Sequence, residues 1–196
     1  MTQQLAPWRS YLSGALHHNG SQPHSRYFQL ATVTSSGLPA NRTVVFRGFV
    51  EHTNQLKIIT DARSQKIAQI AHQPWGEICW YFTKTREQFR LGGKLTLVTA
   101  DYPEQPLCME RQKTWQNITN AARLQFAWPY PGKIRDNGRD AFSPTPPSPD
   151  QPLPNFCLLL LEPEKVEHLQ LKGEPQHRWR YYLDESQSWC VEEINP

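Results

Sequence analysis

The sequence predicts a mainly β (α+β) fold, an antiparallel barrel with a few flanking helices. Many short runs of β-branched, aliphatic and aromatic residues are separated by turn residues. Helical periodicity is confined to a few segments, and strands do not alternate with helices as they do in a parallel βαβ sheet. A chain of 196 residues is long enough to bury one core, so we expect a single domain over residues 1–196.

The first half of the chain begins with an amphipathic helix over residues 7–16. Trp8, Leu12 and Ala15 recur at helical spacing, and His17 to Gly20 form a plausible stop. A meander of antiparallel strands follows, over residues 27–34, 42–50, 55–60, 77–83 and 88–99. A short helix over residues 64–72 interrupts the meander, and Pro74 prevents its continuation.

The second half begins with a helical stretch from about residue 104 to 126. Residues 143–154 are half proline and can join neither a helix nor a ladder, so we expect an extended surface connector, with a disordered insertion as the alternative. Four more strands are expected over residues 156–161, 166–171, 178–183 and 189–194.

Composition and charge exclude several function classes. The chain has 21 basic and 18 acidic residues, a net charge of +3, which is too little for a typical nucleic-acid-binding protein. No apolar run is long enough to span a bilayer, and the N-terminus does not resemble an export signal. We expect a cytoplasmic protein without a metal site or disulfide framework, because the cysteines are scattered: Cys79, Cys108, Cys157 and Cys190.

Two arginines flank an otherwise apolar strand at residues 41–47. Strand alternation places Arg42 on the face of Val44, and Arg47 on the face of Val45, so at least one cation points toward a half-buried surface. The alternative is that each arginine reaches solvent or pairs with a surface carboxylate.

The next strand ends at Thr60 and leads into the short helix through Ser64 and Lys66. A hydroxyl, an ammonium and the free backbone N–H groups of a helix N-terminus are suited to binding a phosphate. The alternative is an ordinary capped helix, with Asp61 or Ser64 as the N-cap and the basic residues solvated.

A third polar group occupies residues 86–93. Gln88 and Arg90 offer amide and guanidinium donors on one strand face, and the pair Gly92 and Gly93 permits a bulge or a close backbone approach. A hairpin that is merely rich in polar residues would look similar.

In this order and spacing, the three motifs resemble those of the pyridoxamine 5′-phosphate oxidase family on the FMN-binding split barrel. The resemblance covers about residues 27–99 and rests on residues 42–47, 60–66 and 87–93. Residues 115 and 126–132 resemble a divergent branch of that superfamily found in cyanobacteria and other organisms. The family's terminal Arg-Leu-His-Asp-Arg signature is degraded at residues 175–179, so the resemblance leaves the substrate open.

The resemblance implies FMN as cofactor and a homodimer, with the flavin across the subunit interface. Gln65 stands where the family usually has arginine, so the resemblance implies a weaker or replaced phosphate contact there, with Arg63 as the candidate replacement. The implied phosphate ligands are Arg42, Ser64, Gln65 and Lys66, and the implied ring contacts are Thr43, Val44, Val45, Ile59, Thr60 and Gln88. From the C-terminal strands, Arg178 and Arg180 are implied to reach the cofactor, while Arg47 and His177 would contact a small phosphorylated substrate.

The implied activity is oxidation of a phosphorylated pyridine amine or alcohol, with O2 as the electron acceptor. The flavin performs the redox step, so no catalytic side chain is assigned. One alternative is a flavin reductase or another FMN oxidoreductase with a nicotinamide donor. Others are a non-catalytic FMN-binding protein and a β-barrel without a cofactor.

Overall fold

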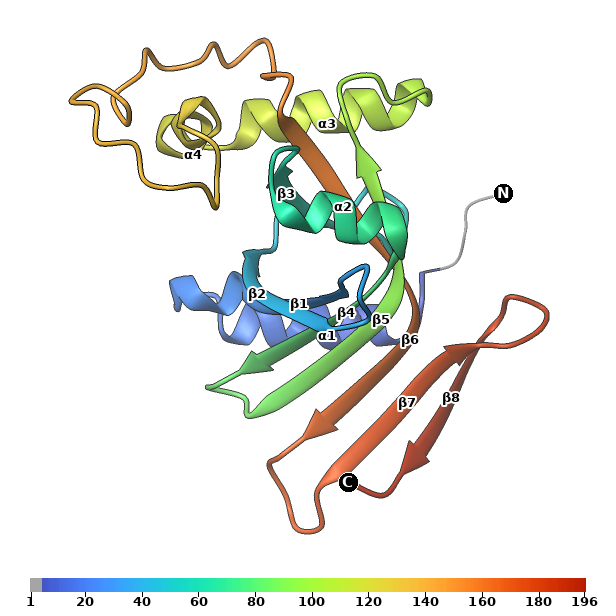
Figure 1. Ribbon diagram of the computed structural model, residues 1–196. Helices are drawn as coiled ribbons and strands as arrows, with labels where there is room; N and C mark the ends of the chain where they lie inside the picture. Colours follow the sequence, from blue (N-terminus) through green and yellow to red (C-terminus); the bar gives the residue numbers. More distant parts are fainter. Residues whose placement is uncertain (1–4) are drawn as a thin grey trace.

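The computed structural model describes residues 5–196 as one curved antiparallel sheet with helices around it (Figure 1). In these residues the sheet has eight strands: β1 (Tyr27–Val33), β2 (Pro39–Val45), β3 (Leu56–Asp61), β4 (Trp75–Phe82), β5 (Glu87–Val98), β6 (Phe156–Gln170), β7 (His177–Leu183) and β8 (Trp189–Ile194). The helical segments are α1 (Trp8–His18), η1 (Pro23–Arg26), α2 (Gln65–His72), α3 (Gln105–Asn117), α4 (Asn120–Leu124) and η2 (Gln125–Ala127). The predicted fold class is confirmed.

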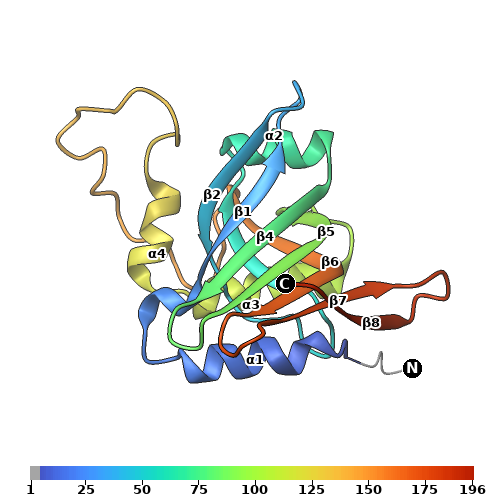
Figure 2. The same ribbon diagram turned by 90° about the horizontal axis from the view of Figure 1, so that it is seen from below.

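The long strand β6 explains why the barrel is split. The strand order is β2-β1-β4-β5-β6-β7-β8, and β3 pairs with β6 off this path. The first part of β6, residues 156–161, pairs with β3, whereas residues 165–170 pair with β7. The same strand therefore belongs to the barrel through residues 156–161 and carries the two-stranded ribbon of β7 and β8 through residues 165–170. This ribbon projects from the barrel (Figure 2).

The structure corrects three expectations about the strands. Residues 156–161 and 166–171 were expected to be separate strands, but residues 156–170 form the single strand β6, because a register shift at Gly92 and Gly93 of β5 accommodates Pro163. The expected strand over residues 42–50 ends at Val45, and the chain turns at Gly48, where φ is +105°. The expected meander, in which neighbouring strands along the chain pair with each other, is also wrong for β3, because β3 pairs with β6, about 100 residues further along the chain.

The helical stretch expected over residues 104–126 is broken in the middle. Ile118 is extended, with φ −83° and ψ 156°, and ends α3. Thr119 then caps α4, since its side chain accepts a hydrogen bond from the Ala122 N–H at 3.2 Å. The proline-rich connector docks on α3, where the Trp115 indole donates to the Ser148 carbonyl at 2.9 Å.

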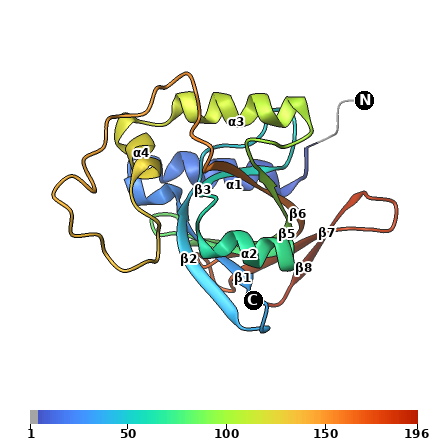
Figure 3. The same ribbon diagram turned by 45° about the horizontal axis from the view of Figure 1, so that its top comes forward.

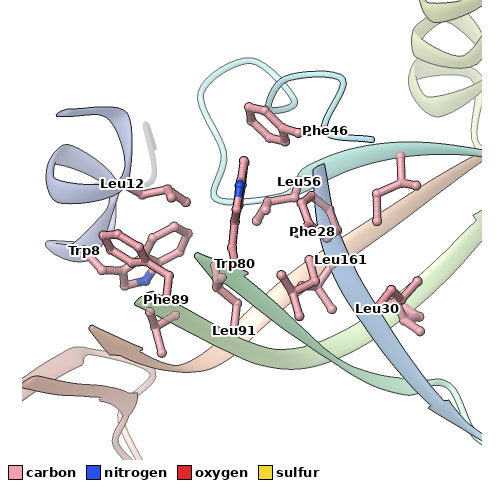
Figure 4. Packing of buried hydrophobic residues seen from close by; sticks show 14 of the residues in the cluster. Trp8, Leu12, Phe28, Leu30, Phe46, Leu56, Trp80, Phe89, Leu91 and Leu161 are labelled. Carbon is pink, nitrogen blue, oxygen red and sulfur yellow. The ribbon is translucent and has the colours of Figure 1, made fainter. Parts of the chain in front are cut away.

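The main core lies between α1 and the sheet (Figure 4). Trp8 and Leu12 of α1 are completely buried, in the same cluster as Trp80 and Phe89 of the sheet. The Trp80 ring centroid lies 4.8 Å from that of Phe28, and its indole N–H donates to the Ser25 carbonyl at 2.9 Å. This core fixes one side of the sheet, and α2 spans the barrel opening at the other end (Figure 3). Within residues 5–196, no helix combines the length and apolarity needed to cross a membrane.

Candidate functional site

A cavity of about 680 Å³ opens between the barrel and the segment that follows α4. This volume suits a nucleotide-sized ligand. One wall is formed by β2, β3, the turn after β3 and α2; its lining residues are Arg42, Thr43, Val44, Val45, Arg47, Ile59, Thr60, Asp61, Arg63 and Lys66. The opposite wall is formed by α4, η2 and the 128–142 loop (residues 128–142), with Trp128, Tyr130, Lys133, Arg135 and Phe142 among its lining residues.

The turn between β3 and α2 places an ammonium between two hydroxyls. Lys66 Nζ donates to Thr60 Oγ1 and to Ser64 Oγ, both at 2.9 Å. Ser64 has extended backbone angles at the N-cap position, but no side chain caps α2. The N–H groups of the first turn of α2 are therefore free of a side-chain acceptor, contrary to the capped-helix alternative.

Arg42 of β2 lies close to Lys66 of this turn and contacts α2 through Gln69. Its guanidinium donates to Thr32 Oγ1 at 2.6 Å and to Gln69 Oε1 at 2.7 Å. Burial lowers the pKa of Arg42, and the residues around it that the structure describes offer neutral acceptors rather than a carboxylate. The positive charge of Arg42 thus remains uncompensated at the cavity.

Two buried N–H donors of the cavity wall have no hydrogen-bond partner within the described chain. They are Nε of Arg47, which follows β2, and Nε1 of Trp128, on the opposite wall. Burial lowers the pKa of Arg47, and the nearby charge of Arg26 lowers it further. Since buried donors are normally paired, these two indicate that a ligand with acceptor groups belongs in the cavity.

Arg63, a candidate phosphate contact from the sequence, lines the cavity but is already engaged in contacts within the chain. Its guanidinium donates to both carboxylate oxygens of Asp61, at 2.9 and 2.7 Å, and to the Phe126 and Trp128 carbonyls at 3.2 and 3.0 Å. Burial alone would raise the pKa of Asp61, but the hydrogen bonds from Arg63 and Asn155 hold it below its usual range. Arg63 therefore anchors the start of the 128–142 loop to the end of β3.

Several residues expected at the site lie outside the cavity of this chain. Ser64 and Gln65, at the start of α2, are not among the lining residues: Ser64 accepts a hydrogen bond from Lys66, which does line the cavity, and Gln65 is exposed. Gln88, Arg178 and Arg180 share the outer face of the sheet, since Gln88 pairs in register with Leu169, which pairs with Arg178. Arg178 binds Glu167 at 2.5 Å and Arg180 binds Glu192 at 2.5 Å. His177 lies on the other face of β7 and contacts Glu193 at 2.7 Å.

Comparisons with known proteins place this geometry in a family. A family model described as the FMN-binding domain of pyridoxamine 5′-phosphate oxidase matches residues 5–99. Pyridoxine/pyridoxamine 5′-phosphate oxidase 2 of Arabidopsis thaliana is 39% identical over 198 residues, which cover 100% of both chains. The chain belongs to the pyridoxamine 5′-phosphate oxidase family.

Solved structures agree with this membership. A pyridoxamine 5′-phosphate oxidase-related, FMN-binding protein of Nostoc punctiforme is 58% identical, with a TM-score of 0.96, over 99% of this chain and 100% of that one. PhzG of Burkholderia lata shares the fold, with a TM-score of 0.74 at 19% identity over 96% of this chain and 90% of that one. As a family member, the protein uses FMN as its cofactor.

The described residues fit the parts of FMN. The hydroxyls of Thr60 and Ser64, the Lys66 ammonium and the first-turn N–H groups of α2, which no side chain caps, suit a phosphate dianion. Val44 and Ile59 give the same cavity an apolar surface suited to a flat ring. The unpaired N–H groups of Arg47 and Trp128 can donate to further acceptor atoms of a ligand.

FMN binding is expected to weaken at alkaline pH. Burial lowers the pKa of Lys66 below its ordinary value of 10.5, and the charge of Arg42 lowers it further. A bound phosphate favours the charged ammonium, so affinity is greatest where Lys66 is protonated and falls as the pH rises through the lowered pKa. Titrations of FMN and riboflavin across pH 7–11, followed by flavin fluorescence, should show a loss for FMN that begins below pH 10.5. Riboflavin has the same ring without the phosphate and controls for ring ionisation; an identical loss for both ligands would contradict the prediction.

Sequence reasoning missed the second wall of the cavity. Residues 126–132 carried a resemblance to one branch of the superfamily, but no role was derived for them. The signal was a tryptophan followed by a tyrosine between two prolines, and then by Lys133 and Arg135. The pairing of this loop with β3 depends on Arg63 contacts to residues more than 60 positions away, which no local pattern specifies.

Proposed function

We propose that this protein is an FMN-dependent oxidoreductase that oxidises a phosphorylated pyridine amine or alcohol, with O2 as the electron acceptor. The observation that carries the proposal is a cavity with two separate cationic groups. Lys66 and Arg42 lie beside the N-terminus of α2, whereas Arg47, with its unpaired Nε, lies beyond the end of β2. One group suits the phosphate of FMN and the other the phosphate of a substrate. The name of the Arabidopsis thaliana relative supports this substrate class.

The side chains in this proposal bind and orient the reactants. Lys66, Thr60 and Ser64 hold the phosphate end of FMN, which supplies the two-electron chemistry when bound. Arg47 binds the substrate phosphate and so holds the pyridine ring against the flavin position. The half-buried position of Arg47 strengthens this ionic contact, because water screens it less than at the surface.

We further propose that a second copy of the chain completes the site. The outer face of β4 and β5, which carries Gln88, also exposes Trp75 and Tyr81, and Tyr27 of β1 is exposed beside them. Exposed aromatic side chains next to fixed polar groups are typical of protein interfaces. In a homodimer, Gln88, Arg178 and Arg180 of one copy would reach the flavin of the other from this face. His177, on the opposite face of β7, would contact the substrate only past the end of the strand, where it is the first residue. Sedimentation analysis of the protein with and without a Tyr81→Arg substitution tests this arrangement, and a wild-type monomer would contradict it.

The proposed activity is tested by turnover of the FMN-loaded protein. We expect oxidation of pyridoxamine 5′-phosphate or pyridoxine 5′-phosphate, with consumption of O2. Reduction of the bound flavin by NADH or NADPH under anaerobic conditions, without oxidation of either pyridine, would instead support a flavin reductase. Bound FMN without turnover by any donor would support the non-catalytic alternative.

Arg47→Met is expected to impair use of the phosphorylated substrate while FMN stays bound. Loss of a charge-assisted contact to phosphate should raise KM for that substrate roughly 10- to 100-fold. The matched control is Arg26→Met, because Arg26 is exposed, lies close enough to affect the charge of Arg47 and does not line the cavity. Steady-state kinetics with FMN occupancy checked by absorbance will measure both variants. An unchanged KM in Arg47→Met would remove Arg47 from the substrate site.

A further inference from the structure

The 128–142 loop passes directly against the proposed phosphate site. Gly132 has φ +77°, a left-handed conformation that lets the chain turn at this point. A Cβ atom at Gly132 would lie 4.0 Å from Nε2 of Gln65, the first residue of α2. The next residues of the loop, Lys133 and Arg135, line the same cavity as Lys66.

The two loop cations have no fixed partner of opposite charge in the described chain. Every ion pair within residues 5–196 involves other residues than Lys133 and Arg135. The carboxylate nearest in sequence, Asp136, also lines the cavity, and its Oδ1 accepts the Gly138 N–H at 2.9 Å. The loop thus brings two cations and one carboxylate to the cavity, which adds net positive charge opposite α2.

The loop is held in place from both ends of the cation-bearing segment. Arg63 binds the Trp128 carbonyl at 3.0 Å and lies over the Tyr130 ring at 5.0 Å. Further along, the Arg135 guanidinium lies 4.7 Å from the centre of the Phe142 ring, which in turn packs edge-on against Trp128 at 5.7 Å. These contacts favour one position of the loop beside the cavity and limit the ordering that ligand binding would require.

We propose that Lys133 and Arg135 form the second half of the phosphate site and close it over the phosphate of FMN. This inference rests on the position of FMN in the proposed function. A phosphate between α2 and the loop receives hydroxyl and N–H donors from one side and two cations from the other. Arg63 serves this site indirectly, because it attaches the cation-bearing loop to β3.

The experiment compares FMN with riboflavin, which lacks the phosphate. The full-length protein freed of flavin is titrated with each ligand, and binding is followed by quenching of flavin fluorescence. For the double variant Lys133→Gln/Arg135→Gln, we expect the dissociation constant of FMN to rise about tenfold and that of riboflavin to stay unchanged. Arg139→Gln is the matched control, because Arg139 lies on the same loop but does not line the cavity.

The outcomes separate this inference from the proposed function. Unchanged FMN binding in the double variant, or equal weakening of both ligands, overturns the role of the loop. An increase only in KM for the phosphorylated substrate also overturns it, since the cations then serve the substrate. Lys66→Met is measured in parallel: if it too leaves the preference for FMN over riboflavin unchanged, the proposed cofactor position itself fails. If Lys66→Met lowers the preference and the double variant does not, only the loop inference fails.

Discussion

Lys66→Met is expected to yield a folded protein that is largely colourless after purification. Lys66 is the cation held between Thr60 and Ser64 at the N-terminus of α2, and methionine fills a similar volume without the charge. Hydrogen bonds to charged groups contribute about 1.5–3 kcal/mol, so the dissociation constant of FMN should rise roughly 10- to 100-fold. Riboflavin affinity should change little. The visible spectrum of the purified protein and fluorescence titrations with both ligands measure the effect.

Loss of FMN in this variant should not reflect unfolding. Lys66 is half-buried, and burial lowers its pKa, so removal of the charge relieves a desolvation cost in the folded protein. The thermal midpoint without FMN should therefore be preserved or raised. The control is Lys113→Met, at an exposed position of α3 that does not line the cavity. A Lys66→Met protein that retains wild-type FMN affinity would show that the phosphate binds elsewhere.

Much of this site follows from local sequence patterns. Strand alternation separated Arg42 from Arg47, and the structure places both at the cavity, with different surroundings. The hydroxyl and ammonium side chains of the turn after β3 are only six positions apart in sequence, so their convergence is also a local property. These elements could be predicted because few residues separate the groups that meet.

The rest depends on contacts between distant parts of the chain. Asp61 and Arg63 suggested a helix cap and a spare phosphate ligand, but together they bind residues 126, 128 and 155. Pairing of β3 with β6 joins residues about 100 positions apart and was hidden by the expectation of a simple meander. Gln88 was placed on the correct strand, yet its exposed sheet face can serve the flavin only if another copy of the chain covers it.

Gly93→Ala is expected to destabilise the folded protein much more than the same substitution at the neighbouring Gly92. Gly93 lies at the register shift between β5 and β6, where the two backbones approach closely. An added Cβ would lie 1.9 Å from the carbonyl oxygen of Glu162 and 2.8 Å from Cα of Pro163. Both are backbone atoms of β6, which pairs with β3, β5 and β7. They can therefore move only if the hydrogen-bonded pairing between these strands shifts.

We expect a loss of about 3 kcal/mol or more in the free energy of unfolding, which corresponds to a decrease of roughly 6–12 °C in Tm for a chain of this size. Gly92→Ala is the matched control at the neighbouring position. Its Cβ would lie 2.6 Å from Cε of Lys165, but that side chain is 59% exposed and can move away into solvent. Gly92→Ala should therefore cost at most about 1 kcal/mol. Equal thermal midpoints for the two variants, measured by calorimetry, would show that close approach of the backbones at Gly93 is not what requires glycine there.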